Sequence, residues 1–381
     1  MPHSTGAHWR LHNPTQVHFG AGTREALARL VDRVQVLAVS TARGRRQFSE
    51  DAVLGPLASG MTWVDSVSAN PGLSETQAEI DRLAGQHFDA IIAFGGGSAM
   101  DAAKALAAGL APGLATRDLA TLIAQPAAHL TSPLLPIHAL PTTSGTGAEV
   151  TPFATIWNHA NRKKLSLASP YLFPVTAIVD PELTYDLPRE ATFSTGLDAL
   201  NQAFESAWNR NCSPVTLLWA GRAVALALEA LPRLHDDLTD RSARASIAEA
   251  SLLAGLCISQ TRTAICHSIS YPLTAHFDLP HGLACAFTMG AVMNECMTDA
   301  PQTIAALAQA AGQKDANALQ TALGAVLAQL DVHARGMKHV TSLDAVLALQ
   351  DEMYTPGRSD NFILPVTSET LERILASSVA G

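Results

Sequence analysis

A run of apolar residues that passes through three glycines into a helix constrains this chain more than any other feature. The segment "FDAIIAFGGGSAMDAAKALA" (88–107) combines a buried strand, a triglycine turn and a helical stretch. Glycines let a backbone approach a ligand closely, and a helix start offers N–H groups at the positive end of its dipole. Ser98 and Asp101 also fit an N-terminal capping pattern, but capping does not explain three consecutive glycines. The turn therefore predicts a phosphate or pyrophosphate site.

The first half of the chain alternates short apolar runs with helical stretches. Buried strands are expected at 34–40, 88–97, 134–143 and 175–181, and helices at 23–32 and 74–86. This alternation is typical of an α/β layer with a largely parallel sheet. After Pro188, long Ala/Leu-rich segments carry helical spacing and almost no strand signal. We expect an α/β domain over residues 1–185 and an all-α domain over residues 186–381.

Composition limits the class of protein. Only 15% of the residues are charged and 48% are hydrophobic, as in a compact globular enzyme, and the net charge of −9 argues against nucleic-acid and anionic-membrane partners. The five cysteines form no CxxC pair, which favours reduced, buried thiols in a cytoplasmic protein. The N-terminal "MPHSTGAHWRLHNP" has no apolar signal core, and no run is expected to span a membrane.

A second polar loop, "LPTTSGTGAEVT" (140–151), follows the next predicted strand. Thr142, Thr143 and Thr146 could supply hydroxyls to the ligand of the triglycine turn. Loops behind neighbouring parallel strands meet at the carboxyl edge of a sheet, where open α/β folds bind ligands.

The end of the first buried strand bears on the choice of dinucleotide. An acid in this region commonly accepts the ribose 2′-hydroxyl of NAD, whereas this chain offers Thr41 followed by Arg43, Arg45 and Arg46. These residues favour the 2′-phosphate of NADPH over NADH, and a solvated basic turn is the alternative.

Two distant segments offer metal ligands. Asp198 and Gln202 lie four positions apart in "STGLDALNQAFESAW", so a helix places both on one face. The segment "CHSISYPLTAHFDLPHG" adds His267 and His281, whereas His276 is expected to be structural. Two oxygen and two nitrogen donors suit Fe(II) or Zn(II).

Several motifs together resemble the iron-dependent (group III) alcohol dehydrogenase family. They are "FGGGSAMDAAK", "LPTTSGTGAEVTPFATI", "IVDPELT", "GLDAL" and "PHGLACA", and the resemblance extends from "NPTQVHFGAG" to "RSDNF". It implies a dinucleotide domain, a helical domain, a divalent metal in the cleft between them, and a homodimer.

The resemblance also implies roles for individual residues. The cofactor would be held by Gly95, Gly96, Gly97, Ser98, Asp101, Asn70, Lys164 and the loop threonines, and the metal by Asp198, Gln202, His267 and His281. Two positions depart from the family pattern. Gln202 stands where a histidine is usual and Tyr271 where one is frequent, so weaker metal binding or a metal-free site are the alternatives.

The expected reaction is hydride transfer from a nicotinamide to an aldehyde carbon, with a bound metal polarising the aldehyde oxygen. Tyr271 or His276 could relay the proton. Segments such as "ESAWNRNCSPVT" and "RSDNFI" resemble the branch that reduces phosphonoacetaldehyde to 2-hydroxyethylphosphonate in phosphonate biosynthesis. Arg210, Arg262 and Arg358 are the candidates for holding its anionic group. The alternatives are a reductase of other small aldehydes, a maleylacetate-type reductase and, less favoured, a dehydroquinate synthase-like lyase.

Overall fold

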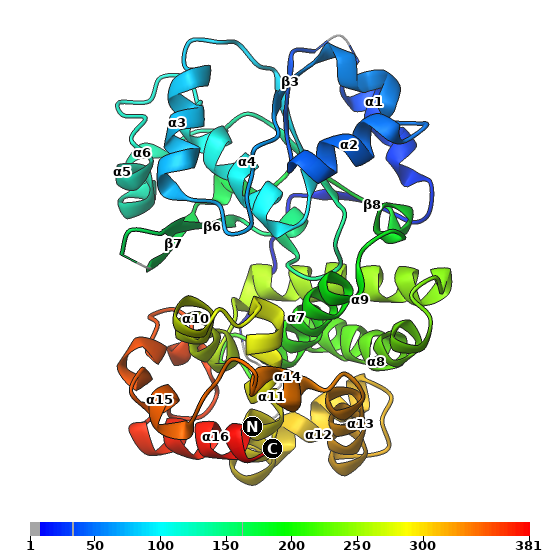
Figure 1. Ribbon diagram of the computed structural model, residues 1–381, viewed down its shortest axis with the longest axis vertical. Helices are drawn as coiled ribbons and strands as arrows, with labels where there is room; N and C mark the ends of the chain where they lie inside the picture. The colour runs from blue at the N-terminus through cyan, green and yellow to red at the C-terminus, as the bar shows by residue number, and fades with distance from the viewer. Residues whose placement is uncertain (1–7, 33, 162) are drawn as a thin grey trace. The chain divides into compact units, whose positions relative to one another are not determined.

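The computed structural model describes residues 8–32, 34–161 and 163–381 (Figure 1). The expectation that the N-terminal segment 1–14 has no apolar signal core falls partly outside these residues, because residues 1–7 are not described. Residue contacts divide the chain into two compact units. Among the described residues, the α/β unit comprises Asn13–Thr143 and Ala148–Asp186, and the helical unit comprises Leu187–Gly381 together with residues 8–12 and Ser144–Gly147.

The α/β unit is built on a six-stranded sheet in which all neighbours are parallel. Its order is β1 (Gln16–Phe19), β8 (Thr176–Val179), β5 (Ile137–Pro141), β4 (Ala90–Gly95), β2 (Val36–Val39) and β3 (Met61–Val64). The predicted fold class is confirmed, and β2, β4, β5 and β8 fall within the four predicted strands. The edge strands β1 and β3 were not predicted, because each is short and only partly buried.

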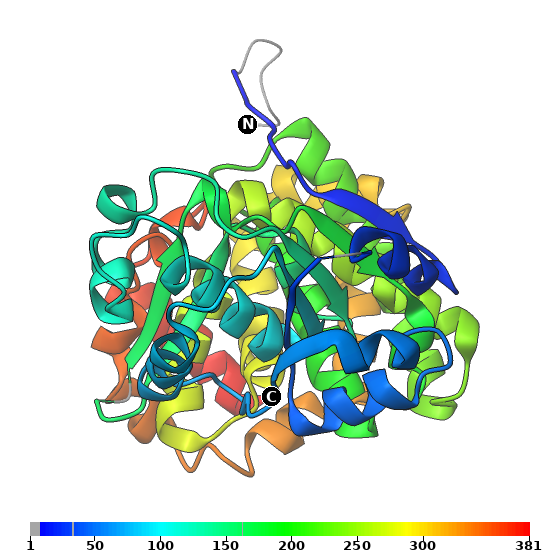
Figure 2. The same ribbon diagram turned by 90° about the horizontal axis from the view of Figure 1, so that it is seen from above.

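Helices cover both faces of this sheet. Leu37 and Ile91 point to the face covered by α3 (Leu73–Leu83) and α4 (Gly97–Gly109), where they pack with Ile80 and Ala103. The alternate strand residues pack on the other face against α1 (Leu27–Leu30) and α2 (Ala42–Glu50). Figures 1 and 2 show the two helix pairs on opposite sides of the strands. Burial on both faces explains why these strands read as continuous apolar runs.

Smaller elements complete the α/β unit. The hairpin of β6 (Phe153–Asn158) and β7 (Lys163–Ala168) is antiparallel, and α5 (Leu119–Ala124) and α6 (Pro126–His129) are short. The helix predicted at 23–32 is wrong in extent, because a 3₁₀ turn (Thr23–Ala26) precedes the single turn of α1. Leu27 is the one buried residue of these two turns, which leaves little packing to sustain a longer helix.

Within residues 187–381 every described element is a helix. They are α7 (Arg189–Ala207), α8 (Pro214–Asp236), α9 (Arg241–Thr261), α10 (Ile265–Phe277), α11 (His281–Asp299), α12 (Pro301–Ala310), α13 (Ala316–Gln329), α14 (Val332–Gly336), α15 (Leu343–Leu347), α16 (Ser368–Ala380) and short 3₁₀ turns. Helix α7 packs against α8, α9 and α11 around one continuous apolar core.

Contrary to the sequence expectation, one described helix is long and apolar enough to cross a membrane. Helix α8 has a mean hydropathy of 1.4 over its most apolar window, half of which is buried inside the unit. It contacts α7, α9, α12 and α13, so its apolar residues belong to the core of the helical unit.

Candidate metal centre and cofactor turn

Four side chains from three helices of the helical unit converge. Asp198 of α7, His267 of α10, and His281 and Cys285 of α11 each offer a ligand atom, and these atoms lie within 4.8 Å of one another. The Asp198 Oδ1 atom lies 3.3 Å from His267 Nε2 and 4.0 Å from His281 Nε2. Three of the four predicted metal-binding residues are therefore brought together from segments that are far apart in the sequence.

A close approach of two helices builds this convergence. A Cβ atom on Gly282 would lie 1.8 Å from the Ser194 carbonyl oxygen and 3.2 Å from the Asp198 Cβ. Only glycine therefore allows the first turn of α11 to reach α7. The glycine of the Pro-His-Gly sequence sets the position of His281 relative to Asp198.

Glu205 orients one of the histidines. Its side chain is fully buried on α7. The Oε2 atom lies 2.6 Å from His267 Nδ1 and accepts the Ala264 backbone N–H at 2.9 Å, while Oε1 accepts the His267 backbone N–H. Because Nδ1 donates to this carboxylate, Nε2 is left to face Asp198, which is the arrangement found around metal-bound histidines. Sequence reasoning missed Glu205, although it shares a helix face with Asp198 and Gln202.

The electrostatics of the cluster favour a positive charge. Burial alone would lower the pKa of His267, but the anionic forms of Cys285 and Glu205 and the bond to Asp198 raise it well above its usual value. Burial raises the pKa of the Cys285 thiol, and His267 opposes that effect. A divalent cation would satisfy the same field while taking the place of the protons.

Gln202 provides an independent test of whether a cation fits. It lies one turn after Asp198 on α7, and its side chain is 2% exposed. Its Oε1 atom is buried and has no hydrogen-bond partner among the described residues. A buried acceptor without a partner is costly and calls for a ligand. The donor set fits a divalent metal, and the orphaned oxygen calls for that metal or for a group bound to it.

The remaining site candidates of the helical unit differ in which side chains they contact. Tyr271 stacks on His281 with ring centroids 6.2 Å apart, and the Arg358 Nε–H donates to its hydroxyl at 3.2 Å. His276 instead pairs with Glu352 at 2.9 Å. Arg210 donates to the Phe362 carbonyl at 2.7 Å and so holds a loop.

Arg262 lies close to Arg358. Its pKa is lowered, first by desolvation and then by the positive charge of Arg358. Its backbone adopts φ = 59°, a conformation that non-glycine residues rarely adopt. Arg358 and Arg262 therefore lie within electrostatic range of each other in a chain of net negative charge.

In the α/β unit the triglycine turn lies at the carboxyl end of β4. Gly95 has φ = 148°, and a Cβ there would lie 2.8 Å from the Ala99 Cβ, so the turn requires glycine. A Cβ on Gly96 would lie 3.1 Å from Thr143, and the Thr142 N–H donates to the Gly95 carbonyl. Both threonines therefore adjoin the turn, as the spacing of the two loops predicted.

The capping prediction for α4 is wrong. Its N-cap is Gly96, and no side chain caps it. The Ser98 hydroxyl instead accepts the N–H of Asn70, which has φ = 58°, and the Asp101 carboxylate accepts the Thr155 N–H at 2.9 Å. Ser98 thus joins the turn to Asn70, and Asp101 joins α4 to β6.

The other cofactor candidates have varied surroundings. Thr41 caps α2 by accepting the Gly44 N–H. Arg43 donates to the Asp186 carbonyl, and Arg45 pairs with Asp65. Lys164 lies on β7 near Asp101. Thr146 belongs by its contacts to the helical unit, whereas the second-loop residues Thr142 and Thr143 belong to the α/β unit.

A buried lysine holds the second loop against α4. Lys104 is fully buried, and its Nζ donates to the carbonyls of Thr151 and Phe153 at 2.8 and 2.9 Å. Burial lowers the pKa of Lys104 to about 8 and raises that of the nearby Glu149 to about 7. Neither residue was predicted from the sequence, in which the signal was a lysine inside an alanine-rich helix.

Comparison with known proteins agrees with this architecture. Residues 14–181 match the family "Iron-containing alcohol dehydrogenase", and residues 192–353 match "Fe-containing alcohol dehydrogenase family, C-terminal". The solved structure of sulfoacetaldehyde reductase from Bifidobacterium kashiwanohense, in complex with NAD⁺, is similar with a TM-score of 0.86. It shares 27% identity, and the match covers 98% of this chain and 100% of that one.

Curated relatives match more closely over shorter stretches. The phosphonoacetaldehyde reductase of Streptomyces viridochromogenes is 45% identical over 208 residues, 54% of this chain and 52% of that protein. The NAD-dependent methanol dehydrogenase of Bacillus methanolicus is 33% identical over 58% of this chain and 57% of that protein. In these matches the chain spans little more than half the length of the curated relatives. The two family matches and the shared fold establish that the chain belongs to the iron-containing alcohol dehydrogenase family.

Proposed function

We propose that this chain reduces a small anionic aldehyde to a primary alcohol at the expense of NADPH or NADH, with phosphonoacetaldehyde as substrate and 2-hydroxyethylphosphonate as product. One hydride and one proton are added to the carbonyl group, and the nicotinamide is oxidised. Family membership supports the reaction class, and the phosphonoacetaldehyde reductase relative supports the substrate. The reaction would belong to phosphonate biosynthesis.

The contacts that connect Arg358 through Tyr271 to His281 support the choice of an anionic substrate. Arg358 donates to the hydroxyl of Tyr271, which stacks on the predicted metal ligand His281. An aldehyde with its oxygen near His281 would place a short anionic tail near Arg358 and Arg262. Guanidinium groups bind phosphonate oxygens through paired, charge-assisted hydrogen bonds.

In the proposed site, Asp198, His267 and His281 would hold a divalent cation, Fe²⁺ or Zn²⁺, with Gln202 as the predicted fourth donor. When bound, such a cation supplies Lewis-acid stabilisation of the charge that develops on the substrate oxygen. Glu205 keeps the His267 ring in the orientation and tautomer that this binding needs. Tyr271, whose ring stacks on His281, would deliver the proton to the product oxygen.

The proposed cofactor site is the triglycine turn with Asn70, Ser98, Asp101, Thr41, Lys164 and the loop threonines. Gly95, Gly96 and Gly97 would let the backbone approach the pyrophosphate, and the first turn of α4 carries no side-chain cap that would compete for its N–H groups. Either nicotinamide dinucleotide fits the proposal, and Arg43, Arg45 and Arg46 favour the 2′-phosphate of NADPH.

The proposal extends to the setting of the enzyme. We expect the protein to be cytoplasmic. We also expect it to form a homodimer, because members of the family are expected to pair. The five cysteines are all buried and unpaired in the structure, in keeping with a reducing compartment.

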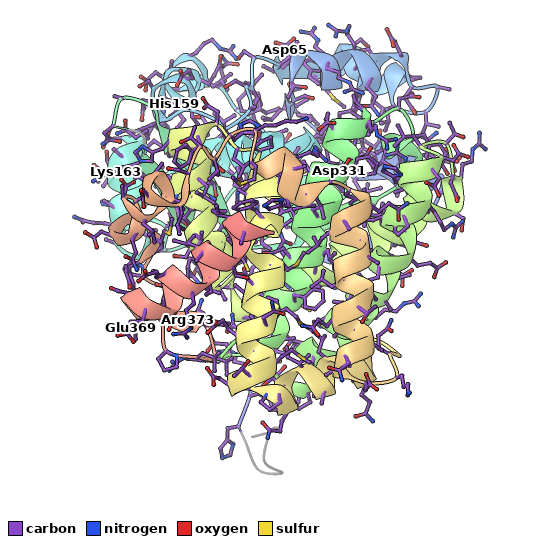
Figure 3. All side chains as sticks on the ribbon, turned by 60° about the horizontal axis from the view of Figure 1, so that its bottom comes forward. Asp65, His159, Lys163, Asp331, Glu369 and Arg373 are labelled. Atoms are coloured by element: carbon purple, nitrogen blue, oxygen red, sulfur yellow. The ribbon has the colours of Figure 1, made fainter. Side chains whose placement is uncertain are left out.

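A comparison of two aldehydes tests the substrate. Wild-type protein should turn over phosphonoacetaldehyde with a higher kcat/KM than acetaldehyde. Arg358→Gln should lower kcat/KM for phosphonoacetaldehyde by roughly 10- to 100-fold and leave that for acetaldehyde nearly unchanged, because a hydrogen bond to a charged group contributes about 1.5–3 kcal/mol. Arg373→Gln is the matched control, since Arg373 lies on α16 with Glu369 and pairs with Glu295 (Figure 3).

Equal losses on both aldehydes would contradict the assigned role of Arg358. A wild-type preference for acetaldehyde would instead favour a reductase of uncharged aldehydes, the activity class of the methanol dehydrogenase relative. Absence of net NAD(P)H consumption with any aldehyde would favour the lyase alternative.

A further inference from the structure

The cluster of possible metal ligands includes a cysteine, Cys285, that was not predicted from the sequence. We propose that the Cys285 thiolate is the fourth protein ligand, beside Asp198, His267 and His281, and that the centre is a zinc site. This inference deepens the proposed function, on which it rests, because it replaces the predicted Gln202 as fourth donor and chooses between the two metals.

The position of Cys285 on α11 supports direct ligation. It lies four residues after His281, so the two side chains share one helix face. Its Sγ atom lies 4.0 Å from His281 Nε2, the nitrogen that also lies 4.0 Å from Asp198 Oδ1. Zinc bonds of about 2.0–2.3 Å give separations of about 3.3–3.8 Å between ligands at tetrahedral angles, and zinc can expand to five-coordinate, which would admit a substrate oxygen. The observed distances need only a small contraction to reach that geometry.

The other nitrogens of the two histidines have their own partners, which aims both Nε2 atoms at the cluster. His267 Nδ1 bonds Glu205, and His281 Nδ1 lies 3.4 Å from the Ser270 hydroxyl. Ser270 in turn donates to the His267 carbonyl at 2.8 Å. The cluster therefore presents one oxygen, two nitrogens and one sulfur toward a common centre.

Charge favours the thiolate over the amide as the fourth donor. All four side chains except the partly exposed His281 are buried, so an uncompensated cation charge would be costly there. The Asp198 carboxylate and a Cys285 thiolate would place two negative charges directly on a divalent cation, whereas Asp198 with a neutral Gln202 amide would place only one. A sulfur donor beside two imidazoles selects zinc, while amide oxygens suit harder cations.

Gln202 then has a different role. Its orphaned Oε1 lies one turn from Asp198 and can accept a hydrogen bond from a water or a substrate hydroxyl at the centre. This role accounts for its burial without requiring it to bind the metal.

X-ray absorption spectroscopy of the zinc-loaded protein tests the proposal without relying on activity. Wild-type protein should show one sulfur scatterer at about 2.3 Å beside nitrogen and oxygen scatterers at about 2.0–2.2 Å. Cys285→Ser should lose the sulfur scatterer. Cys296→Ser is the matched control, because Cys296 is equally buried on the same helix but lies outside the cluster, and it should keep the wild-type spectrum.

Zinc affinity, measured by competition with a chromophoric chelator, separates the two candidate donors. Cys285→Ser should weaken zinc binding beyond the roughly 10–100-fold that removal of an outer-shell partner typically costs, whereas Gln202→Leu should weaken it by less than about 10-fold. Should a variant fail to fold, the wild-type spectrum still decides the question.

A wild-type spectrum with nitrogen and oxygen scatterers alone, or a larger affinity loss in Gln202→Leu than in Cys285→Ser, would overturn the assignment. In either case aldehyde reduction with metal-loaded protein would show that the proposed function stands. Failure of the wild-type protein to bind zinc would overturn the inference, and aldehyde reduction by that metal-free protein would separate this result from failure of the reductase proposal.

Discussion

At the scale of single residues, the metal centre depends on groups that never touch a substrate. Glu205 fixes the ring of His267 through a 2.6 Å contact and also accepts two backbone N–H groups at the start of α10. One buried carboxylate therefore couples α7 to α10 and sets the tautomer of a proposed ligand.

Glu205→Gln should lower zinc affinity by about 10- to 100-fold, because the amide cannot accept all three hydrogen bonds and no longer stabilises the correct tautomer. The measurement is chelator competition, with circular dichroism to confirm folding. Glu229→Gln, an exposed change on α8, should have no effect on zinc affinity. Unchanged affinity in Glu205→Gln would remove Glu205 from the centre.

Some of these residues could be predicted from the sequence and others could not. Asp198, His267 and His281 were predicted as donors from residue type and position, and the family motifs then supported them, since spacing alone does not show that α7 and α11 meet. Cys285 lies inside "PHGLACA" but was not predicted as a donor, although a helix starting at His281 places it on the same face. Its sulfur can be recognised as a possible metal donor only when the fold shows that ligands on α7 and α10 face this part of α11.

At the scale of elements, the close contact between α7 and α11 is the feature on which the cluster depends. Glycine is the only residue type that fits at position 282, because a side-chain carbon would overlap the backbone of α7.

Gly282→Ala should therefore lower the free energy of unfolding by about 1–3 kcal/mol through overpacking, and should weaken zinc binding by moving His281 and Cys285 away from Asp198. Denaturant titration and chelator competition measure the two effects. Gly324→Ala on α13 is the control, since nothing lies within 4 Å of an added Cβ there, and it should stabilise the protein by about 0.5–1 kcal/mol. Normal zinc binding in Gly282→Ala would show that the helix contact does not set the centre.

A second element-scale prediction concerns pH and the loop behind α4. The pKa of Glu149 is raised by burial from 4.5 to about 7, so the folded chain keeps a proton that the unfolded chain releases. Stability should therefore fall as the pH rises from about 4.5 to about 7. Glu149→Gln should remove this contribution, with a gain over wild type that is absent near pH 4 and reaches up to about 3 kcal/mol above pH 7.

Thermal and denaturant unfolding across this pH range check the prediction. A constant difference between Glu149→Gln and wild type at every pH would contradict the buried, protonated state of Glu149.

At the scale of the whole molecule, the sequence predicted the α/β unit and the helical unit better than it predicted the bounds of individual strands and helices. Central strands such as β4 are buried on both faces and read as apolar runs, whereas the edge strand β3 has three half-buried residues and gives little signal. Residues 144–147 pack with the helical unit although they follow a strand of the sheet. This packing depends on tertiary contacts, so no local sequence pattern predicts it.

Because all the proposed ligands lie in the helical unit, metal binding should stabilise that unit by about 2.7 kcal/mol at a hundredfold excess of free zinc over Kd. Hydrogen exchange should slow in α7, α10 and α11 on zinc addition and should not change in β2 and β4. An Asp198→Asn variant should show a much smaller zinc effect. Equal slowing throughout both units in wild type would place the bound zinc elsewhere.

The central claim is direct hydride transfer between a nicotinamide and an aldehyde, and the fate of a deuterium atom tests it most directly. Metal-loaded protein is supplied with NADPH carrying deuterium at the transferable C4 position and with phosphonoacetaldehyde, and the product is followed by ³¹P and ²H NMR. The account predicts 2-hydroxyethylphosphonate with one deuterium on the carbinol carbon for each cofactor oxidised. Product without deuterium, or no oxidation of the cofactor, would contradict it.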